Sequence, residues 1–169
     1  MTEYYEMVWL LIAGVILMLV SPILWMRSSP RQRHIESLRE FARSTGMQVI
    51  LHRRPDARED EDRLETVCYR LPWRGFRPNE NWVLHRHSQR GWESRFSDWQ
   101  WFIAEAHEDL AEPLLVATTS MPESVSAVLC SASGIGVTWA EREDTEALAT
   151  ILHSLSILRD LLEKKHLKP

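Results

Sequence analysis

The sequence predicts an α+β protein: one N-terminal transmembrane helix followed by a small soluble domain with a mainly antiparallel sheet and about three helices. Three observations lead to this fold class. Residues 7–26 form an uncharged apolar run. Short segments of alternating polarity then come in adjacent pairs separated by turn residues, which is typical of antiparallel strands. Apolar residues also recur at helical spacing in three later segments. After the apolar run, the 169-residue chain keeps enough residues for one domain with its own core.

The apolar run Met7–Met26 contains no Asp, Glu, Lys, Arg or His. A helix of about 20 residues is about 30 Å long, which matches the hydrocarbon core of a bilayer. Trp9 and Trp25 lie near the two ends of the run, where indole rings favour the lipid interface. We therefore expect a spanning helix in contact with the lipid bilayer, preceded by a short extracytoplasmic segment, residues 1–6.

The basic residues follow the apolar run and do not precede it. No Lys or Arg occurs before Met7, whereas Arg27, Arg31 and Arg33 come soon after Met26. The positive-inside rule then places the N-terminus outside and the C-terminal domain in the cytoplasm. A cleaved signal peptide would carry its basic residues first. The pattern predicts a single-pass protein of the cell inner membrane, with Trp9, Trp25, Arg27, Arg31 and Arg33 at the membrane interface.

Residues 27–46 have the signals of a basic juxtamembrane helix. Ser29 and Pro30 suit the cap and the first helical position, and Thr45-Gly46 suits the end. The arginines allow contact with anionic lipid head groups. Alternatively, the helix connects the two parts of the chain and packs Ile35, Leu38 and Phe41 onto the domain. Both interpretations remain open from the sequence.

The remaining residues, 47–169, are predicted to form the cytoplasmic α+β domain. Two hairpins are expected, one around Gln89–Gly91 and one around residues 131–134, because turn residues separate alternating segments there. A helix follows about Glu108, and Asp144 or Thr145 caps a second one. The expected strands are residues 47–53, 64–71, 82–88, 92–96, 98–103, 125–130 and 135–139.

Few residues indicate chemistry. His85 and His87 lie on one face of a probable strand and could bind a metal, with His52, Cys68 or Cys130 as a third ligand, but paired strand histidines more often carry none. No phosphate-binding GxxxxGK[ST], no GxGxxG and no GxSxG motif occurs. We therefore predict no catalytic residue, no cofactor and no metal, with a membrane-tethered enzyme or metal-binding domain as an alternative.

The two cysteines and the overall charge add further expectations. Cys68 and Cys130 are 62 positions apart without a CxxC pattern, so we expect two buried free thiols in a reducing compartment. The formal net charge is -4, whereas nucleic-acid binding calls for a clustered basic face. No nucleic-acid partner is predicted.

Aromatic and basic residues alternate between Trp73 and Trp101. Trp and Arg are enriched in the residues that dominate protein–protein binding energy. We expect Trp82, Phe96 and Trp101 in the core. We expect Trp73, Arg74, Phe76 and Arg77 on an exposed loop that binds a partner protein.

The exit of the apolar run reads Ser21-Pro22-Ile23-Leu24-Trp25-Met26-Arg27-Ser28-Ser29-Pro30-Arg31-Gln32. This layout resembles small single-pass inner-membrane proteins of proteobacteria, some of which are labelled YajC-like subunits of the Sec preprotein translocase. The resemblance covers about the first 45 residues and implies a bacterial inner-membrane protein; no functional residue carries over from it. The leading hypothesis is a non-enzymatic interaction or accessory module of a membrane assembly, whose partner is another membrane or cytoplasmic protein. A Sec-translocase-associated subunit is the alternative.

Overall fold

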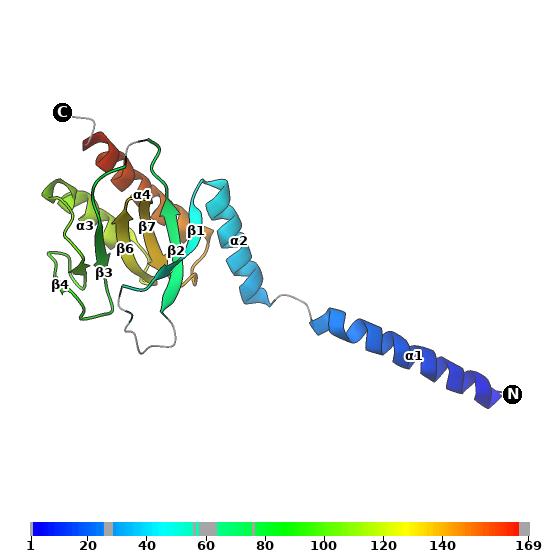
Figure 1. Ribbon diagram of the computed structural model, residues 1–169. Coiled ribbons are helices and arrows are strands. Elements are labelled where there is room, and N and C mark those ends of the chain that lie inside the picture. Colours follow the sequence, from blue (N-terminus) through cyan, green and yellow to red (C-terminus); the bar gives the residue numbers. More distant parts are fainter. Residues whose placement is uncertain (1, 26–28, 56, 58–63, 76, 166–169) are drawn as a thin grey trace. The chain divides into compact units, whose positions relative to one another are not determined.

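The computed structural model describes residues 2–25, 29–55, 57, 64–75 and 77–165 (Figure 1). The chain divides into two compact units, residues 1–34 and 35–169. The second unit is the α+β domain. This unit begins at Ile35, inside the predicted juxtamembrane helix.

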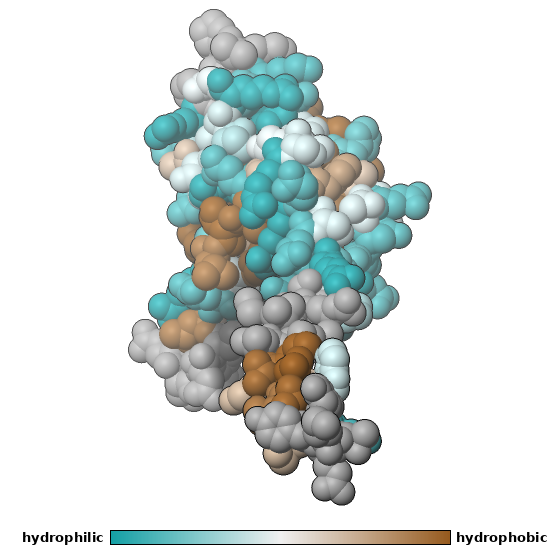
Figure 2. Space-filling model, turned by 90° about the vertical axis from the view of Figure 1, so that its right-hand side faces the viewer, coloured by the Kyte–Doolittle hydropathy of each residue, from teal (hydrophilic) through white to brown (hydrophobic). Residues whose placement is uncertain are grey.

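The first helix, α1, covers Thr2–Trp25. Its side chains from Met7 to Met18 include many exposed apolar residues, and Trp9 is 68% exposed. Figure 2 shows hydrophobic residues on this helix in brown. A membrane span requires about 20 consecutive apolar residues in one helix, and no helix in the described part of the chain is long and apolar enough to cross a membrane. The predicted transmembrane helix over Met7–Met26 is therefore wrong, although its residues up to Trp25 are helical.

The second helix, α2, covers Pro30–Ser44 and has the predicted ends. The Ser29 hydroxyl accepts a hydrogen bond from the Gln32 amide at 3.2 Å, and Gly46 ends the turn with a φ of +81°. Leu38 and Ala42 are fully buried in the domain core. The helix therefore packs onto the domain, as the connecting interpretation required; the alternative of lipid contact stays a prediction.

Within the described residues, seven strands form one sheet in which every pair is antiparallel, so the predicted mainly antiparallel sheet is confirmed. The strand order is β1-β2-β7-β6-β3-β5-β4. The strands are β1 Gln48–Arg53, β2 Glu65–Leu71, β3 Trp82–His85, β4 Trp92–Glu93, β5 Gln100–Phe102, β6 Val125–Ser131 and β7 Gly134–Trp139. The hairpin of β6 and β7 around residues 131–134 is the predicted one.

The predicted hairpin around Gln89–Gly91 does not exist, because β3 and β4 do not pair with each other. Strand β5 lies between them and pairs with both, so that Val83 faces Phe102 and Trp92 faces Trp101. Gly91 has the expected positive φ, +96°. Its role is close approach: a Cβ there would lie 1.9 Å from the Trp101 carbonyl oxygen. The sequence correctly indicated a turn at Gly91. The predicted pairing of β3 with β4 was wrong, because β3 pairs with β5.

Two further helices lie beside one another behind the sheet (Figure 1). Helix α3 covers Ala111–Ser120 after a short 3₁₀ turn, and α4 covers Thr145–Lys165. The Asp144 carboxylate caps α4 by accepting hydrogen bonds from the Glu146 and Ala147 amides at 3.1 and 3.0 Å. Helix side chains and one face of the strands share a single core cluster. Trp82, Phe96 and Trp101 belong to that core, as predicted.

Both cysteines are buried and free, as predicted. Burial raises the pKa of each thiol from its ordinary value near 9 to about 12. The thiolate is the reactive form. We expect Cys68 and Cys130 to resist a thiol reagent such as Ellman's at pH 8 in the folded chain and to react within seconds in denaturant.

The raised pKa values of the two thiols make the free energy of unfolding depend on pH in the alkaline range. Above about pH 9 the unfolded chain releases both thiol protons while the folded chain keeps them, so the free energy of unfolding falls as pH rises from about 9 to 12. Urea titrations between pH 8 and 11 measure this slope. A Cys68→Ala, Cys130→Ala variant should show a shallower slope, and an equal slope in both proteins would contradict the assignment.

Candidate functional site

The predicted partner-binding residues lie on the segment that follows β2, residues 72–77, which we call the Trp–Arg loop. Trp73 is half-buried and packs against the core. Its indole Nε1 donates a hydrogen bond to the Ser131 carbonyl oxygen at 3.0 Å. Trp73 is therefore an anchor of the loop and not a fully exposed side chain.

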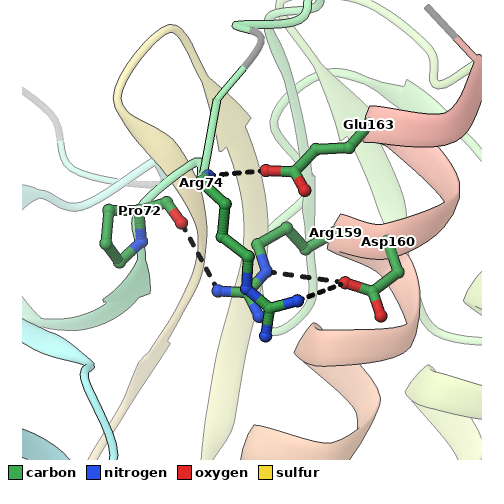
Figure 3. A network of polar contacts seen from close by, with 5 residues as sticks. All are labelled: Pro72, Arg74, Arg159, Asp160 and Glu163. Atoms are coloured by element: carbon green, nitrogen blue, oxygen red, sulfur yellow. Dashed lines mark hydrogen bonds and ion pairs between the residues drawn. The ribbon is translucent and has the colours of Figure 1, made fainter. Parts of the chain in front are cut away.

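Arg74 binds two carboxylates that lie three residues apart on α4 (Figure 3). Its backbone N–H donates to Glu163 Oε1 at 2.7 Å. Its guanidinium Nη1 lies 3.4 Å from Asp160 Oδ1, and both of these side chains are exposed. Exposed ion pairs contribute little to stability, so these contacts mainly set the loop's position.

Arg159 lies on α4, contacts the start of the loop and is only 5% exposed. Its Nη1 donates a long hydrogen bond, 3.4 Å, to the Pro72 carbonyl oxygen, and its Nε lies 3.8 Å from Asp160 Oδ1 (Figure 3). Burial lowers the pKa of Arg159, and the charge of Arg74 lowers it further. Arg159 thus ties the start of the loop to α4.

The outer part of the loop faces solvent. Arg74, Gly75 and Arg77 are exposed, and Phe76 lies outside the described residues. The loop therefore presents two arginines on a backbone whose start is held by Trp73, Glu163 and Arg159. Such prior ordering lowers the entropic cost of binding.

The predicted membrane-interface residues belong to the first unit. Trp9 of α1 and Arg31 and Arg33 of α2 are exposed. Arg27 lies outside the described residues, and the side chain of Trp25 is not described. Their predicted contact with lipid stays a prediction.

The two histidines considered as metal ligands do not form a pair. His85 is buried on β3, and its Nε2 is 2.7 Å from the Arg90 carbonyl oxygen. His87 lies beyond the end of the strand with a φ of +71°, and it is exposed. Among the described residues, no group of three or more His, Cys, Asp or Glu side chains is placed to hold a metal.

A polar cleft of about 840 Å³ lies beyond the end of β3. Arg86 forms part of its wall: its Nε donates to the Val125 carbonyl oxygen at 2.5 Å, its Nη2 donates to the Pro122 carbonyl oxygen, and its guanidinium lies 4.8 Å from the centre of the Trp99 ring. Burial lowers the pKa of Arg86, and nearby carboxylates oppose that shift. The cleft is lined by Arg86, His87, Ser88, Gln89, Glu93, Ser94, Phe96, Ser97, Asp98, Trp99, Gln100 and Glu123.

Sequence reasoning missed this cleft because its walls come from three separate segments. His87 and Asp98 adopt positive φ values, +71° and +65°. Such values are uncommon outside glycine, and no motif announces them. Arg86 has two of its three nitrogens bound to carbonyl oxygens, so its main role here is to hold the segment that follows α3 against Trp99.

Comparison with known proteins found no matching family model, no matching curated protein and no matching solved structure. The resemblance to YajC-like proteins gains no support from these comparisons.

Proposed function

We propose that the α+β domain is a non-enzymatic interaction module that binds another protein through the Trp–Arg loop. The proposal rests on the hydrogen bonds that hold the start of the loop, at Pro72, Trp73 and Arg74, which we call the clamp. Trp73 is bound to the β6–β7 turn, and Arg74 and Pro72 are bound to α4. Arg77, next to the clamped part, remains exposed.

The chemistry of the loop favours a partner surface with carboxylates. Arginine binds carboxylates with two parallel hydrogen bonds and is enriched among the residues that dominate interface energy. Arg74 already has Asp160 as a neighbour, so the Arg77 guanidinium is the group best placed to meet an acidic partner.

We expect Arg77→Glu to weaken capture of the partner at least about tenfold, because it replaces an attractive charge by a repulsive one at the interface. The measurement is quantitative co-purification from native membranes and cytosol in mild detergent, with the tagged full-length chain as bait. The free energy of unfolding should stay within about 0.5 kcal/mol of wild type, because the side chain is exposed.

Arg142→Glu is the matched control, since Arg142 is also exposed and lies on a different loop. It makes the same change in net charge. The proposal fails if Arg142→Glu and Arg77→Glu reduce capture equally, or if no protein distinguishes wild type from Arg77→Glu.

Location at the cell inner membrane stays a prediction. A Sec-translocase-associated role also stays a prediction, and it requires that the Sec channel be among the proteins that wild type captures and Arg77→Glu loses. A membrane-tethered enzyme is the remaining alternative. The polar cleft beyond β3 is one place where such an activity could lie.

A further inference from the structure

Two arginine side chains share one carboxylate beside the start of the Trp–Arg loop (Figure 3). Asp160 Oδ1 lies 3.4 Å from Nη1 of Arg74 and 3.8 Å from Nε of Arg159. Hydrogen bonds between a guanidinium and an ionised carboxylate are ordinarily about 2.7–2.9 Å long. Because both of these distances are longer, neither cation makes a close contact with Asp160.

Arg159 has fewer acceptors than a buried guanidinium ordinarily has. Its side chain is 5% exposed, and among the described residues no atom accepts a hydrogen bond from its Nε. Its Nη1 makes only a long contact, 3.4 Å, with the Pro72 carbonyl oxygen. Burial lowers the pKa of Arg159, and the charge of Arg74 lowers it further. Since buried donors nearly always have a partner, a closer approach of Asp160 would stabilise Arg159.

Arg74 is accessible to a different carboxylate. Its side chain is 66% exposed and meets Asp160 through one long contact. Its backbone is held separately, because its N–H donates to Glu163 Oε1 at 2.7 Å. A carboxylate from outside can bind the guanidinium with two parallel hydrogen bonds, which is a stronger arrangement. Asp160 is then released from Arg74, and a movement of about 1 Å brings its Oδ1 within hydrogen-bond distance of Arg159 Nε.

We propose that Asp160 is an internal competitor for the partner's carboxylate: an acidic group of the partner replaces Asp160 on Arg74, and Asp160 closes onto Arg159. Arg74 thereby becomes a second binding residue beside Arg77. The exchange rests on the proposed interaction function. It adds that the partner presents an acidic peptide segment to the loop and that Asp160 limits how tightly this segment is bound.

Hexaglutamate, a short acidic peptide, is the probe for this exchange. It is titrated into the ¹⁵N-labelled full-length chain in mild detergent at pH 7, and the Nε–H signals of the arginine side chains report its binding. Asp160→Asn should lower the dissociation constant about three- to fivefold, the equivalent of one exposed ion pair.

Glu146→Gln is the matched control for Asp160→Asn. Glu146 is exposed on the same helix, and its substitution makes the same change in net charge. The two residues are 14 positions apart in the sequence, which is about 21 Å along a helix. In about 0.1 M salt, interactions between exposed charges at this distance are largely screened. Glu146→Gln should therefore leave the dissociation constant nearly unchanged.

Arg74→Gln separates the exchange from a general effect of charge. In this background Asp160→Asn should no longer tighten binding, because the residue for which Asp160 competes is absent. In the wild-type chain, the Arg159 Nε–H signal should also shift downfield on binding, as Asp160 begins to accept its hydrogen bond. The proposed exchange is wrong if Asp160→Asn tightens binding equally with and without Arg74, or if the Arg159 signal does not move. It is also wrong if hexaglutamate shows no saturable binding up to about 10 mM.

The exchange and the interaction function can fail separately. If Arg77→Glu loses a captured protein while Asp160→Asn leaves hexaglutamate binding unchanged, the interaction function stands and the exchange is wrong. If the hexaglutamate results are as expected while no protein distinguishes wild type from Arg77→Glu, the acidic-peptide site stands and the proposed interaction function is wrong.

Discussion

Replacing Arg39 by methionine should lower the free energy of unfolding by about 3–5 kcal/mol, because it leaves a buried carboxylate without its cation. Glu141 is only 7% exposed. Arg39 reaches it from α2 with two parallel hydrogen bonds, Nε to Oε1 at 2.9 Å and Nη2 to Oε2 at 3.0 Å. The Tyr69 hydroxyl of β2 donates a third, to Oε1, at 2.7 Å. Methionine keeps much of the apolar part of the arginine side chain. The decrease in the free energy of unfolding therefore comes mainly from removal of the guanidinium charge.

The hydrogen bonds of this network shift the pKa values of Arg39 and Tyr69. The hydrogen bond with Glu141 raises the pKa of Arg39. Burial raises the pKa of Tyr69, and the hydrogen bond to Glu141 raises it further. Glu141 itself adopts a φ of +53°, so the chain accepts an uncommon backbone conformation at the residue that receives all three hydrogen bonds. The network joins α2, β2 and the segment before α4.

Urea denaturation at pH 7, followed by tryptophan fluorescence, measures the effect. Tyr69→Phe is the matched comparison. It removes one hydrogen bond to a charged group and no charge, so it should cost about 1.5–3 kcal/mol. A loss below about 1 kcal/mol for Arg39→Met would mean that Glu141 finds enough water or another partner, and that burial of its charge has been overestimated.

Gly91→Ala should be the second strongly destabilising change, with a loss of about 3–5 kcal/mol from backbone strain and steric conflict combined. The φ of +96° is unfavourable for any residue with a side chain. The added Cβ would also lie 1.9 Å from the Trp101 carbonyl oxygen. Because that oxygen belongs to backbone, β5 must move away, and its pairing with β4 and β3 is disturbed.

Gly75→Ala is the control for this prediction. Gly75 lies in the Trp–Arg loop, and a Cβ there meets no atom within 4 Å. Its effect on stability should stay within about 1 kcal/mol, and reduced chain entropy in the unfolded state even favours the alanine. Thermal unfolding of both variants under one set of conditions makes the comparison. If both substitutions lowered the melting temperature equally, the chain would be able to relieve the contact between a Cβ at position 91 and the Trp101 carbonyl oxygen without loss of stability, and the prediction would be wrong.

Much of the fold follows from local patterns in the sequence. The cap at Ser29, the stop at Gly46, the β6–β7 hairpin and the Asp144 cap depend on residues within a few positions of one another. The burial of Trp82, Phe96 and Trp101 follows from their size and apolarity. For the candidate site, the sequence pointed to the Trp–Arg loop by its composition, and Arg74 and Arg77 are exposed as expected.

Other features required distant partners that no local pattern specifies. Strand β5 lies between β3 and β4, and the alternation of polarity along one segment does not specify which strand becomes its partner. The anchoring of Trp73 by Ser131 and of Arg74 by Glu163 joins residues 58 and 89 positions apart. The apolar run at the N-terminus was predicted from its composition to span a membrane. That prediction was wrong, because no described helix has the length and apolarity that a span requires.

By itself, then, the sequence determined the element types, the antiparallel β6–β7 hairpin and the identity of the large core residues, since short-range backbone and burial preferences govern these features. Tertiary structure alone decided the strand order, the Arg39–Glu141–Tyr69 network and the clamp on the Trp–Arg loop. Each of these depends on side chains that lie far apart in the sequence and become neighbours only when the whole domain folds. Such long-range contacts are chosen by the packing of the whole domain and leave no periodic trace in the sequence.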